Sequence, residues 1–230
     1  MKKLSLLLAL LCTVSVLHVA SARPTSRLFV PSVDVVDMDA AKKTLRIFRC
    51  IPTYEGNVRE EPAGSCTVID TRTLLTALHV VDNPDYSYKV QIGTRMLKLK
   101  IGPIVQGLDV VRLTVSEDIG IAPIEMDYAP LRVGDKHFIS GFAWGEHEVQ
   151  RHGIVEGFAS RPVYRDDFFC YVESTAFVQG GMSGGCVIRN GKMVGVVIES
   201  WINREGSIFI SAMAFQSVLD NTPLSLNGVS

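Results

Sequence analysis

Short runs of apolar residues, or of alternating apolar and polar residues, recur along the chain from residue 45 onward. Glycine, proline, asparagine and aspartate separate these runs, and only the segment near residues 214–220 shows a helical pattern. Alternation with frequent turn residues is typical of an all-β barrel protein, so we predict that class. The expected strands span residues 45–50, 66–69, 88–92, 97–101, 110–115, 119–124, 137–142, 150–155, 168–172, 186–188, 193–198 and 207–211.

The first 22 residues differ from the rest of the chain. A positively charged start is followed by an apolar run over residues 4–16 and then by Ala20-Ser21-Ala22, a small-x-small cleavage site. This pattern predicts a signal peptide (1–22) cut after Ala22, because the apolar run is short for a membrane span. We therefore expect a secreted or periplasmic protein that is not held at the membrane after cleavage.

Charge and histidine spacing exclude several kinds of partner. The chain has 23 basic and 24 acidic residues, and loss of Lys2 and Lys3 with the signal peptide leaves 21 against 24, a net charge of −3. No basic cluster indicates binding to nucleic acid or to an anionic membrane. His137, His147 and His152 lack the close spacing of a metal site, so we expect no metal and no cofactor.

The most informative motif is Gly181-Met182-Ser183-Gly184-Gly185, in which glycines stand on both sides of one serine. Such a turn can expose the hydroxyl group and aim backbone N–H groups beside it, as a serine nucleophile requires. The same residues can also form a simple turn. Residues earlier in the chain distinguish a catalytic serine from a simple turn.

The positions of the histidines restrict the kind of hydrolase. In α/β-hydrolases the histidine follows the serine, whereas the chymotrypsin order is His, Asp, Ser. The chain has five histidines, all before Ser183: His18, His79, His137, His147 and His152. This order excludes an α/β-hydrolase. A subtilisin order through Asp70 is formally possible, but that fold needs helices between parallel strands. The best candidate for the general base is His79, which follows an apolar strand.

Two aspartates after His79 could orient its imidazole ring. Asp118 stands directly before the expected strand at 119–124, so its carboxylate should lie at a strand end. Asp109 precedes Val-Val-Arg-Leu, which is typical of an ordinary strand entry. We favour Asp118 and keep Asp109 as the alternative.

From about residue 66 to 219 the chain resembles the chymotrypsin-fold (trypsin-like) serine proteases, and most of all the HtrA (Deg) branch. The matching segments are Thr76-Ala-Leu-His79 and those at 118–122, 131–135, 141–145, 153–155, 174–185 and 191–196. The resemblance implies two six-stranded antiparallel β-barrels, with the catalytic triad in the cleft between them, and endopeptidase activity on proteins or peptides.

The resemblance also implies a domain organisation. Residues 23–43 form an N-terminal arm, and residues 44–230 form the protease domain. Residues 23–36 show no clear period and are either part of this arm or a removable pro-segment. The first barrel is expected at about 44–126, the second at about 131–212, and a C-terminal helix follows. HtrA proteins usually carry a PDZ domain, but only residues 221–230 follow that helix, so none is expected.

The resemblance assigns roles to individual residues. Ser183 is the expected nucleophile, His79 the base and Asp118 the orienting acid, and the N–H groups of Gly181 and Ser183 form the oxyanion hole. Met182 stands where relatives commonly have Asn or Asp, which excludes activation by pairing of a new N-terminus with an aspartate at that position.

By the same resemblance, the walls of the primary substrate pocket come from residues 176–178 and 197–201. Val178 belongs to this wall, and Phe177 at the pocket base favours an apolar or small substrate side chain. Glu199 could select a basic one if it points inward.

Four cysteines remain after removal of the signal peptide, and an even number in an exported protein suggests disulfides. Four cysteines allow three pairings. Placed on the strands of the resembled fold, they favour Cys50–Cys66 and Cys170–Cys186.

Two other functions are compatible with this fold. A non-catalytic binding protein on a protease scaffold usually lacks one member of the triad, and all three are present here. A viral protease would share the mechanism, but the signal peptide and the absence of polyprotein flanks argue against it.

Overall fold

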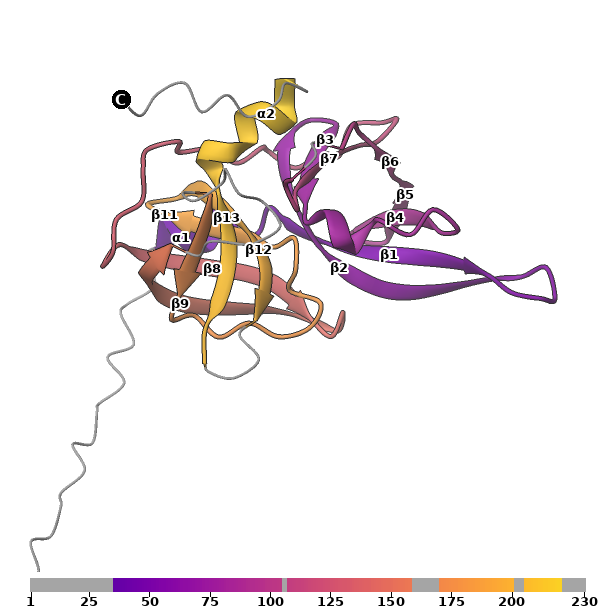
Figure 1. The fold of residues 1–230 in the computed structure, drawn as a ribbon. Coiled ribbons are helices and arrows are strands. Elements are labelled where there is room, and N and C mark those ends of the chain that lie inside the picture. The colour runs from indigo at the N-terminus through magenta and orange to yellow at the C-terminus, as the bar shows by residue number, and fades with distance from the viewer. Residues whose placement is uncertain (1–34, 105–106, 159–169, 201–204, 221–230) are drawn as a thin grey trace, which may run out of the picture. The chain divides into compact units, whose positions relative to one another are not determined.

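The computed structural model describes residues 35–104, 107–158, 170–200 and 205–220 (Figure 1). Most of these residues lie in β-strands or in the turns between them, which confirms the predicted all-β class. The helical elements are α1 (Val35–Ala41), α2 (Phe215–Asp220) and two 3-10 helices, η1 (Leu78–Val80) and η2 (Ala212–Ala214). None of the helices in these ranges has the length and apolar character needed to span a bilayer. The predicted signal peptide lies outside the described residues.

The N-terminal half forms an antiparallel sheet with the strand order β5-β4-β1-β2-β3-β7-β6. Its strands are β1 (Thr44–Pro52), β2 (Val58–Asp70), β3 (Thr73–Thr76), β4 (Ser87–Ile92), β5 (Arg95–Lys98), β6 (Lys100–Ile101) and β7 (Val111–Thr114). Although β5 and β6 lie at opposite ends of this order, only Leu99 separates them in the chain. One continuous segment therefore supplies both edges of the sheet, and this half is a nearly closed barrel.

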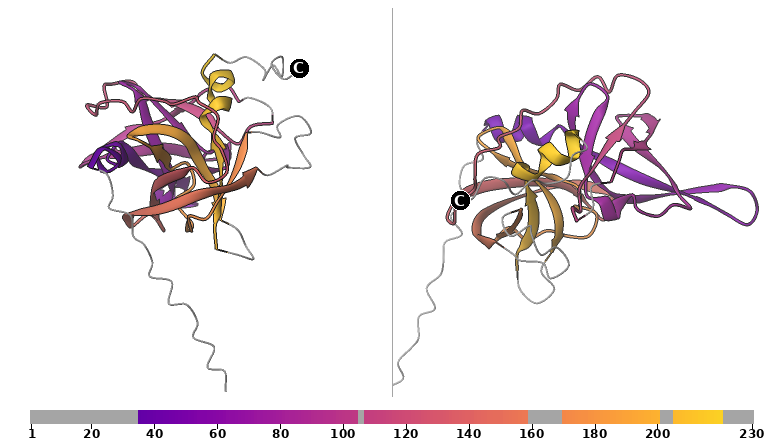
Figure 2. Two further views of the ribbon diagram at one scale, coloured as in Figure 1. Left: turned by 90° about the vertical axis from the view of Figure 1, so that its left-hand side faces the viewer. Right: turned by 45° about the horizontal axis from the view of Figure 1, so that its top comes forward.

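The β1–β2 hairpin is longer than the alternating pattern indicated. The strand predicted at 66–69 is only the last part of β2, whose earlier residues pair with β1 from Ile47 to Pro52. This outer part of the hairpin extends away from the barrel in each view that shows it from the side (Figures 1 and 2). The inner part, from Gly64 onward, lies against the second barrel and takes part in the candidate site.

The C-terminal half is a closed barrel with the order β10-β13-β12-β11-β8-β9. Its strands are β8 (Lys136–Ala143), β9 (His147–Phe158), β10 (Tyr171–Ser174), β11 (Cys186–Arg189), β12 (Lys192–Ser200) and β13 (Ser207–Ser211). Among the strands that the structure describes, closure leaves none of this barrel with an unpaired edge, so the serine motif before β11 is attached to a continuously hydrogen-bonded support. Two barrels, one closed and one nearly closed, agree with the predicted trypsin-like fold.

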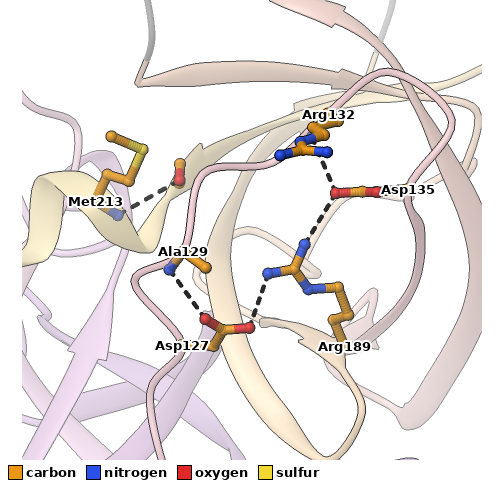
Figure 3. A network of polar contacts seen from close by, with 7 residues as sticks. Asp127, Ala129, Arg132, Asp135, Arg189 and Met213 are labelled. Carbon is orange, nitrogen blue, oxygen red and sulfur yellow. Dashed lines mark hydrogen bonds and ion pairs between the residues drawn. The ribbon is translucent and has the colours of Figure 1, made fainter.

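A polar network holds the segment between the two barrels, near residue 127. The N–H group of Asp127 donates to the carbonyl of Met193 at 2.9 Å. Figure 3 shows the guanidinium of Arg189 between the carboxylates of Asp127 and Asp135, at 2.7 and 2.9 Å. The hydrogen bond from Arg189 is the main reason why the pKa of Asp127 lies below its ordinary value. The connection is thus anchored to the β11–β12 hairpin.

The expected N-terminal arm contains a helix that the sequence pattern did not reveal. Within residues 23–43, α1 packs against β8, β11 and β12 of the second barrel. Ala40 and Ala41 are buried there, and the carboxylate of Asp37 accepts a hydrogen bond from the N–H group of Gly191 at 2.7 Å. The described part of this segment is therefore an integral piece of the barrel surface.

The strand predicted at 119–124 is wrong, because these residues form a loop. Gly120 has a φ of +76°, outside the extended region, and Pro123 provides no N–H group for a strand ladder. The carboxylate of Asp118 accepts a hydrogen bond from Gly120 N at 2.7 Å, which stabilises the turn.

The predicted Cys50–Cys66 disulfide is also wrong, since both cysteines are thiols in the structure. In the β1–β2 register, Cys66 lies opposite Leu45 and Cys50 lies opposite Glu60. Five residues of extended strand separate the two positions by roughly 16 Å. A disulfide requires Cα atoms within about 7 Å of each other.

The second predicted disulfide fails for a similar reason. Cys186 is a buried thiol at the start of β11, whereas Cys170 directly precedes β10. These strands are three positions apart in either direction around the closed barrel, so the two cysteines lie on opposite sides of it. Neighbouring strands are about 4.8 Å apart, and no side-chain movement can bridge that separation.

Candidate active site

The first part of the candidate site is the pair formed by His79 and Asp109. β3 pairs with β7 so that Thr76 lies opposite Val111, and continuing this register places Asp109 beside η1, which carries His79. Leu78 N donates to the carbonyl of Asp109 at 3.2 Å. The carboxylate of Asp109 holds His79 twice, through Nδ1 at 2.7 Å and through the backbone N–H group at 2.9 Å. The imidazole orientation is thus fixed by strand pairing.

This geometry corrects the sequence interpretation of the third residue. The carboxylate that holds His79 is that of Asp109, whereas the carboxylate of Asp118 accepts from Gly120 N in its own turn. A signal in the sequence pointed the same way. The segment after Asp118 contains Gly120 and Pro123, which disfavour a regular strand, and the segment after Asp109 contains neither.

The surroundings of His79 alter its affinity for a proton. Burial lowers the pKa of His79, but the hydrogen bond and the negative charge of Asp109 raise it. The charges of Asp82 and Glu199 raise it further, and the net pKa lies above the ordinary value. The imidazole side chain is 42% exposed, so it is open to an approaching substrate. A base of this kind is ready to accept a proton near neutral pH.

The second part is the serine loop, 181–185, which leads into β11 of the other barrel. The carbonyl of Ser183 accepts a hydrogen bond from Ser65 N, on β2, at 2.8 Å. A side chain at Gly184 would collide with the hydroxyl of Thr76 and meet Ala77 N, which lie just before His79. The glycine therefore permits close packing, and the serine loop lies against the segment that carries His79.

The Ser183 hydroxyl has its own partner in the structure. Oγ donates to the carbonyl of Ile198, on β12, at 3.0 Å. Within the described residues, no hydrogen bond joins Ser183 Oγ to His79. In enzymes without substrate, catalytic hydrogen bonds are often long or misaligned and tighten when the substrate binds. The serine loop thus packs close to His79, but the Ser183 hydroxyl is hydrogen-bonded to Ile198 and not to the imidazole.

The backbone of the serine loop is oriented by two hydrogen bonds. The carbonyl of Gly180 accepts from Trp144 N at 2.7 Å, and the carbonyl of Met182 accepts from Gly185 N at 2.9 Å. Because a trans peptide holds its C=O and N–H groups antiparallel, the N–H groups of Gly181 and Ser183 point away from these partners. Within the described residues, neither of these two N–H groups donates to a backbone acceptor outside the strands.

Met182 holds the loop from inside. Its side chain is fully buried in the core of the second barrel, and its sulfur accepts a hydrogen bond from Gln179 N at 3.4 Å. An aspartate at this position would need a charged partner in that apolar core. The loop is thus anchored by apolar burial.

The predicted pocket residues are only partly open to solvent. Phe177 is 44% exposed and Glu199 is exposed, whereas Val178 is buried in the core of the second barrel. Trp201, at the end of the predicted pocket wall, lies outside the described residues. Within the described residues, no cluster of three or more His, Cys, Asp and Glu side chains could hold a metal ion.

Sequence reasoning missed two backbone contributions to the site. Trp144 N orients the Gly180 carbonyl, and the Ile198 carbonyl accepts from the candidate nucleophile. Any residue type can make such contacts through its main chain, so no sequence signal marks them. Trp144 is unusual in one respect, because its φ of +51° is rare for an aromatic residue.

Residues 64–196 match the family model of the trypsin-like peptidase domain. The chain belongs to the trypsin-like peptidase domain family. This confirms the resemblance based on the segments around His79 and Ser183, both of which lie within the match.

Individual relatives agree with this assignment. The chain is 28% identical over 138 residues to the periplasmic serine endoprotease DegP of Escherichia coli. The matched residues cover 58% of this chain and 29% of DegP. The chain therefore spans less than a third of the length of that relative.

Solved structures show the same fold at low sequence identity. The HtrA-type protease AlgW with a decapeptide has a TM-score of 0.68 at 16% identity, covering 82% of this chain and 67% of AlgW. The Rv3671c protease from M. tuberculosis in its active form has a TM-score of 0.68 at 20% identity, covering 85% of this chain and 90% of that one.

Proposed function

We propose that this trypsin-like domain is an exported serine endopeptidase in which Ser183 is the nucleophile, His79 the general base and Asp109 the residue that orients it. One observation carries the proposal. His79 Nδ1 lies 2.7 Å from the carboxylate of Asp109, and the serine loop packs against the residues just before His79 in the chain. In support, the first barrel contributes His79 and Asp109 and the second contributes Ser183, the three residue types that nucleophilic attack by serine requires.

In the proposed reaction, Ser183 Oγ leaves the Ile198 carbonyl and donates its proton to His79 Nε2 while it attacks the scissile carbonyl carbon. Asp109 accepts from Nδ1–H and stabilises the imidazolium ion. Collapse of the tetrahedral intermediate breaks the C–N bond, and the departing amine takes the proton from Nε2. Water then attacks the acyl ester, with His79 accepting its proton and returning one to Ser183 Oγ.

The N–H groups of Gly181 and Ser183 are proposed to hold the oxyanion of both tetrahedral intermediates. Support comes from the orientation of their peptides, which the contacts of the Gly180 and Met182 carbonyls determine. Loss of one donor in a comparable site costs about 3–4 kcal/mol of transition-state stabilisation. The positive φ of Gly181, +89°, is a conformation that glycine adopts without strain.

Proteins and peptides are the proposed substrates. Phe177 presents an exposed aromatic surface close before the serine loop and favours an apolar side chain at the cleaved bond. Glu199 is the alternative determinant and would favour a basic side chain. Its negative charge contributes to the raised pKa of His79, which supports its place near the proposed base.

Casein and a fluorogenic peptide library test the proposal. The purified chain should cleave casein, the library should show a preference for apolar over basic residues before the cut, and Ser183→Ala should abolish cleavage while circular dichroism stays unchanged. Cleavage that persists in Ser183→Ala would place the nucleophile elsewhere. A folded wild-type chain that leaves both substrates intact would overturn the proposed activity.

A peptide-binding protein without catalysis is the second candidate, because Ser183 Oγ donates to Ile198 and not to His79. In that case the wild-type chain would bind casein peptides and release them uncut. Calorimetry with mass analysis of the recovered peptide separates the two functions.

Export is proposed from the predicted signal peptide and from the periplasmic location of DegP. N-terminal sequencing of the mature protein should begin at Arg23. A protein recovered with Met1 from the cytoplasm would contradict export.

A further inference from the structure

Ser65 is a buried residue of β2 that makes contacts on three sides at the interface between the barrels. It has no exposed surface, and its carbonyl accepts from the Thr76 hydroxyl at 2.7 Å. Its N–H group donates to the Ser183 carbonyl, and its hydroxyl donates to the Gly181 carbonyl, both at 2.8 Å. One residue of the first barrel therefore holds two of the three carbonyls at the start of the serine loop.

The Ser65 hydroxyl has a second partner. Its oxygen accepts a hydrogen bond from Phe142 N, near the end of β8, at 2.9 Å. Phe142 lies two residues before Trp144, whose N–H group orients the Gly180 carbonyl. The hydroxyl thus contacts both segments that the Gly180–Trp144 hydrogen bond joins.

Gly181 is the residue that most needs such support. Its φ of +89° is one of several conformations that glycine adopts at little cost, so the residue does not specify its own geometry. Two hydrogen bonds hold the peptide between Gly181 and Met182. Its carbonyl accepts from the Ser65 hydroxyl, and its N–H group donates to the Gln179 carbonyl at 3.0 Å. Rotation of this peptide would change the direction of the neighbouring N–H groups.

We propose that Ser65 is a positioning residue, which keeps the N–H groups of Gly181 and Ser183 directed at the oxyanion through the hydroxyl contacts to Gly181 and Phe142. This inference rests on the proposed function. Ser65 does not touch the reacting atoms, and its contribution is made through the backbone of the serine loop. Because it belongs to β2, it also makes the oxyanion hole of the second barrel depend on the docking of the first.

The proposal predicts an effect on turnover and not on substrate binding. In Ser65→Ala, the Gly181 carbonyl and the Phe142 N–H group both lose a partner, and the loop gains alternative conformations. We expect kcat for fluorescently labelled casein to fall about tenfold or more, less than for the loss of a donor itself, with KM within about twofold. The rate of fluorophosphonate labelling should fall by a similar factor, since its phosphoryl oxygen uses the same donors. The midpoint of the pH–rate profile should not move, because the contact between His79 and Asp109 is intact.

Two further variants separate positioning from general destabilisation. Ser65→Thr keeps the hydroxyl and should recover most of the turnover. Ser140→Ala removes an equally buried serine hydroxyl from β8 and leaves the main chain in place. This hydroxyl donates to Glu148 at 2.8 Å, and in the part of the chain that the structure describes it makes no hydrogen bond to the serine loop. It should leave kcat unchanged. All rates are divided by the folded fraction from urea denaturation, so partial unfolding does not count as lost catalysis.

The outcomes are distinguishable. A kcat in Ser65→Ala within twofold of the wild-type value, or an equal loss in Ser140→Ala, would overturn the role of Ser65 and leave the proposed protease intact. A rise in KM together with a shifted pH midpoint would also overturn it, because the defect would then lie in the whole cleft. Absence of hydrolysis and labelling in the wild-type chain would instead refute the proposed function.

Discussion

The two barrels contribute to the candidate site in different ways. The first barrel supplies side-chain chemistry, because the register of β3 and β7 brings His79 and Asp109 into contact. The second supplies backbone geometry, in which glycines allow the serine loop to take positive φ angles and to pack closely. A single changed functional group should therefore disable the first barrel's contribution, whereas the second should be most sensitive to added volume.

The largest effect expected on the side-chain half comes from Asp109→Asn. The amide can no longer hold the tautomer that leaves Nε2 free to accept a proton, and in a comparable triad this change lowers kcat about 10⁴-fold. Asp118→Asn is the matched control and should change kcat by less than about twofold, since that carboxylate serves a surface turn. Steady-state cleavage of casein measures both. Equal losses, or a larger loss in Asp118→Asn, would return the orienting role to Asp118.

Gly181→Ala tests the contribution that the backbone of the second barrel makes to the site. A Cβ atom there would lie 2.5 Å from the Phe142 carbonyl and 2.9 Å from Trp144 N, at a φ that disfavours any side chain. We expect kcat to fall about 10²- to 10³-fold through distortion of the proposed oxyanion hole. Gly134→Ala is the control, because Gly134 has a similar φ, +93°, and no atom lies within 4 Å of the added carbon. Casein cleavage rates of the two variants separate the effect of a local collision from that of general backbone strain. Equal rates would contradict the assignment of the oxyanion hole to Gly181 and Ser183.

The pH profile sharpens the description of the first barrel. A base works in its neutral form, so the rate should rise with pH through the raised pKa of His79, with a midpoint above about 6.5. Asp109→Asn should lower this midpoint most, and Glu199→Gln should lower it less, since each removes a negative charge that favours the imidazolium. Initial rates across the pH range measure the shift. A midpoint that rises in either variant would contradict the account.

The same shift has a consequence for stability. A group whose pKa is higher in the folded state stabilises the fold at low pH, and this contribution is lost as pH rises through the folded-state value. Urea denaturation of the wild type and of His79→Ala should therefore show a difference in unfolding free energy that shrinks as pH rises above neutrality. A difference that grows with pH would have the wrong sign.

The smallest effect is expected from reducing agents, which should leave both halves unchanged. Cys50, Cys66 and Cys186 are buried thiols in the structure, and burial raises the pKa of Cys66 and raises that of Cys186 to about 12. Iodoacetamide should label neither Cys66 nor Cys186 in the folded protein, and it should label both after denaturation without reductant. Mass spectrometry counts the labels. Cysteines that stay unlabelled in urea until reductant is added would indicate a disulfide.

The sequence was sufficient where the evidence is local. Alternation indicated most strands of both barrels, and the glycines around Ser183 marked a turn with special geometry. The short helix α1 escaped because its seven residues cover barely two turns, too few to show a period.

Other features depend on contacts between distant parts of the chain. Asp109 meets His79 only because β7 pairs with β3, and the cysteine count carried no information on the β1–β2 register that separates Cys50 from Cys66. Ser65 had no signal either, since its contacts are to main-chain groups far along the sequence. The sequence alone shows which residues are neighbours along a strand, whereas the register of strand pairing decides which residues of different strands lie side by side.

The proposed function requires that Ser183 is a nucleophile activated by His79 across the barrel interface. Fluorophosphonate labelling followed by peptide mass mapping tests it most directly. We expect one adduct, on the peptide that contains Ser183. It should form at the same rate in the wild type and in Asp118→Asn, and more than about 100-fold slower in His79→Ala. An adduct on another residue, or undiminished labelling of Ser183 in His79→Ala, would contradict it.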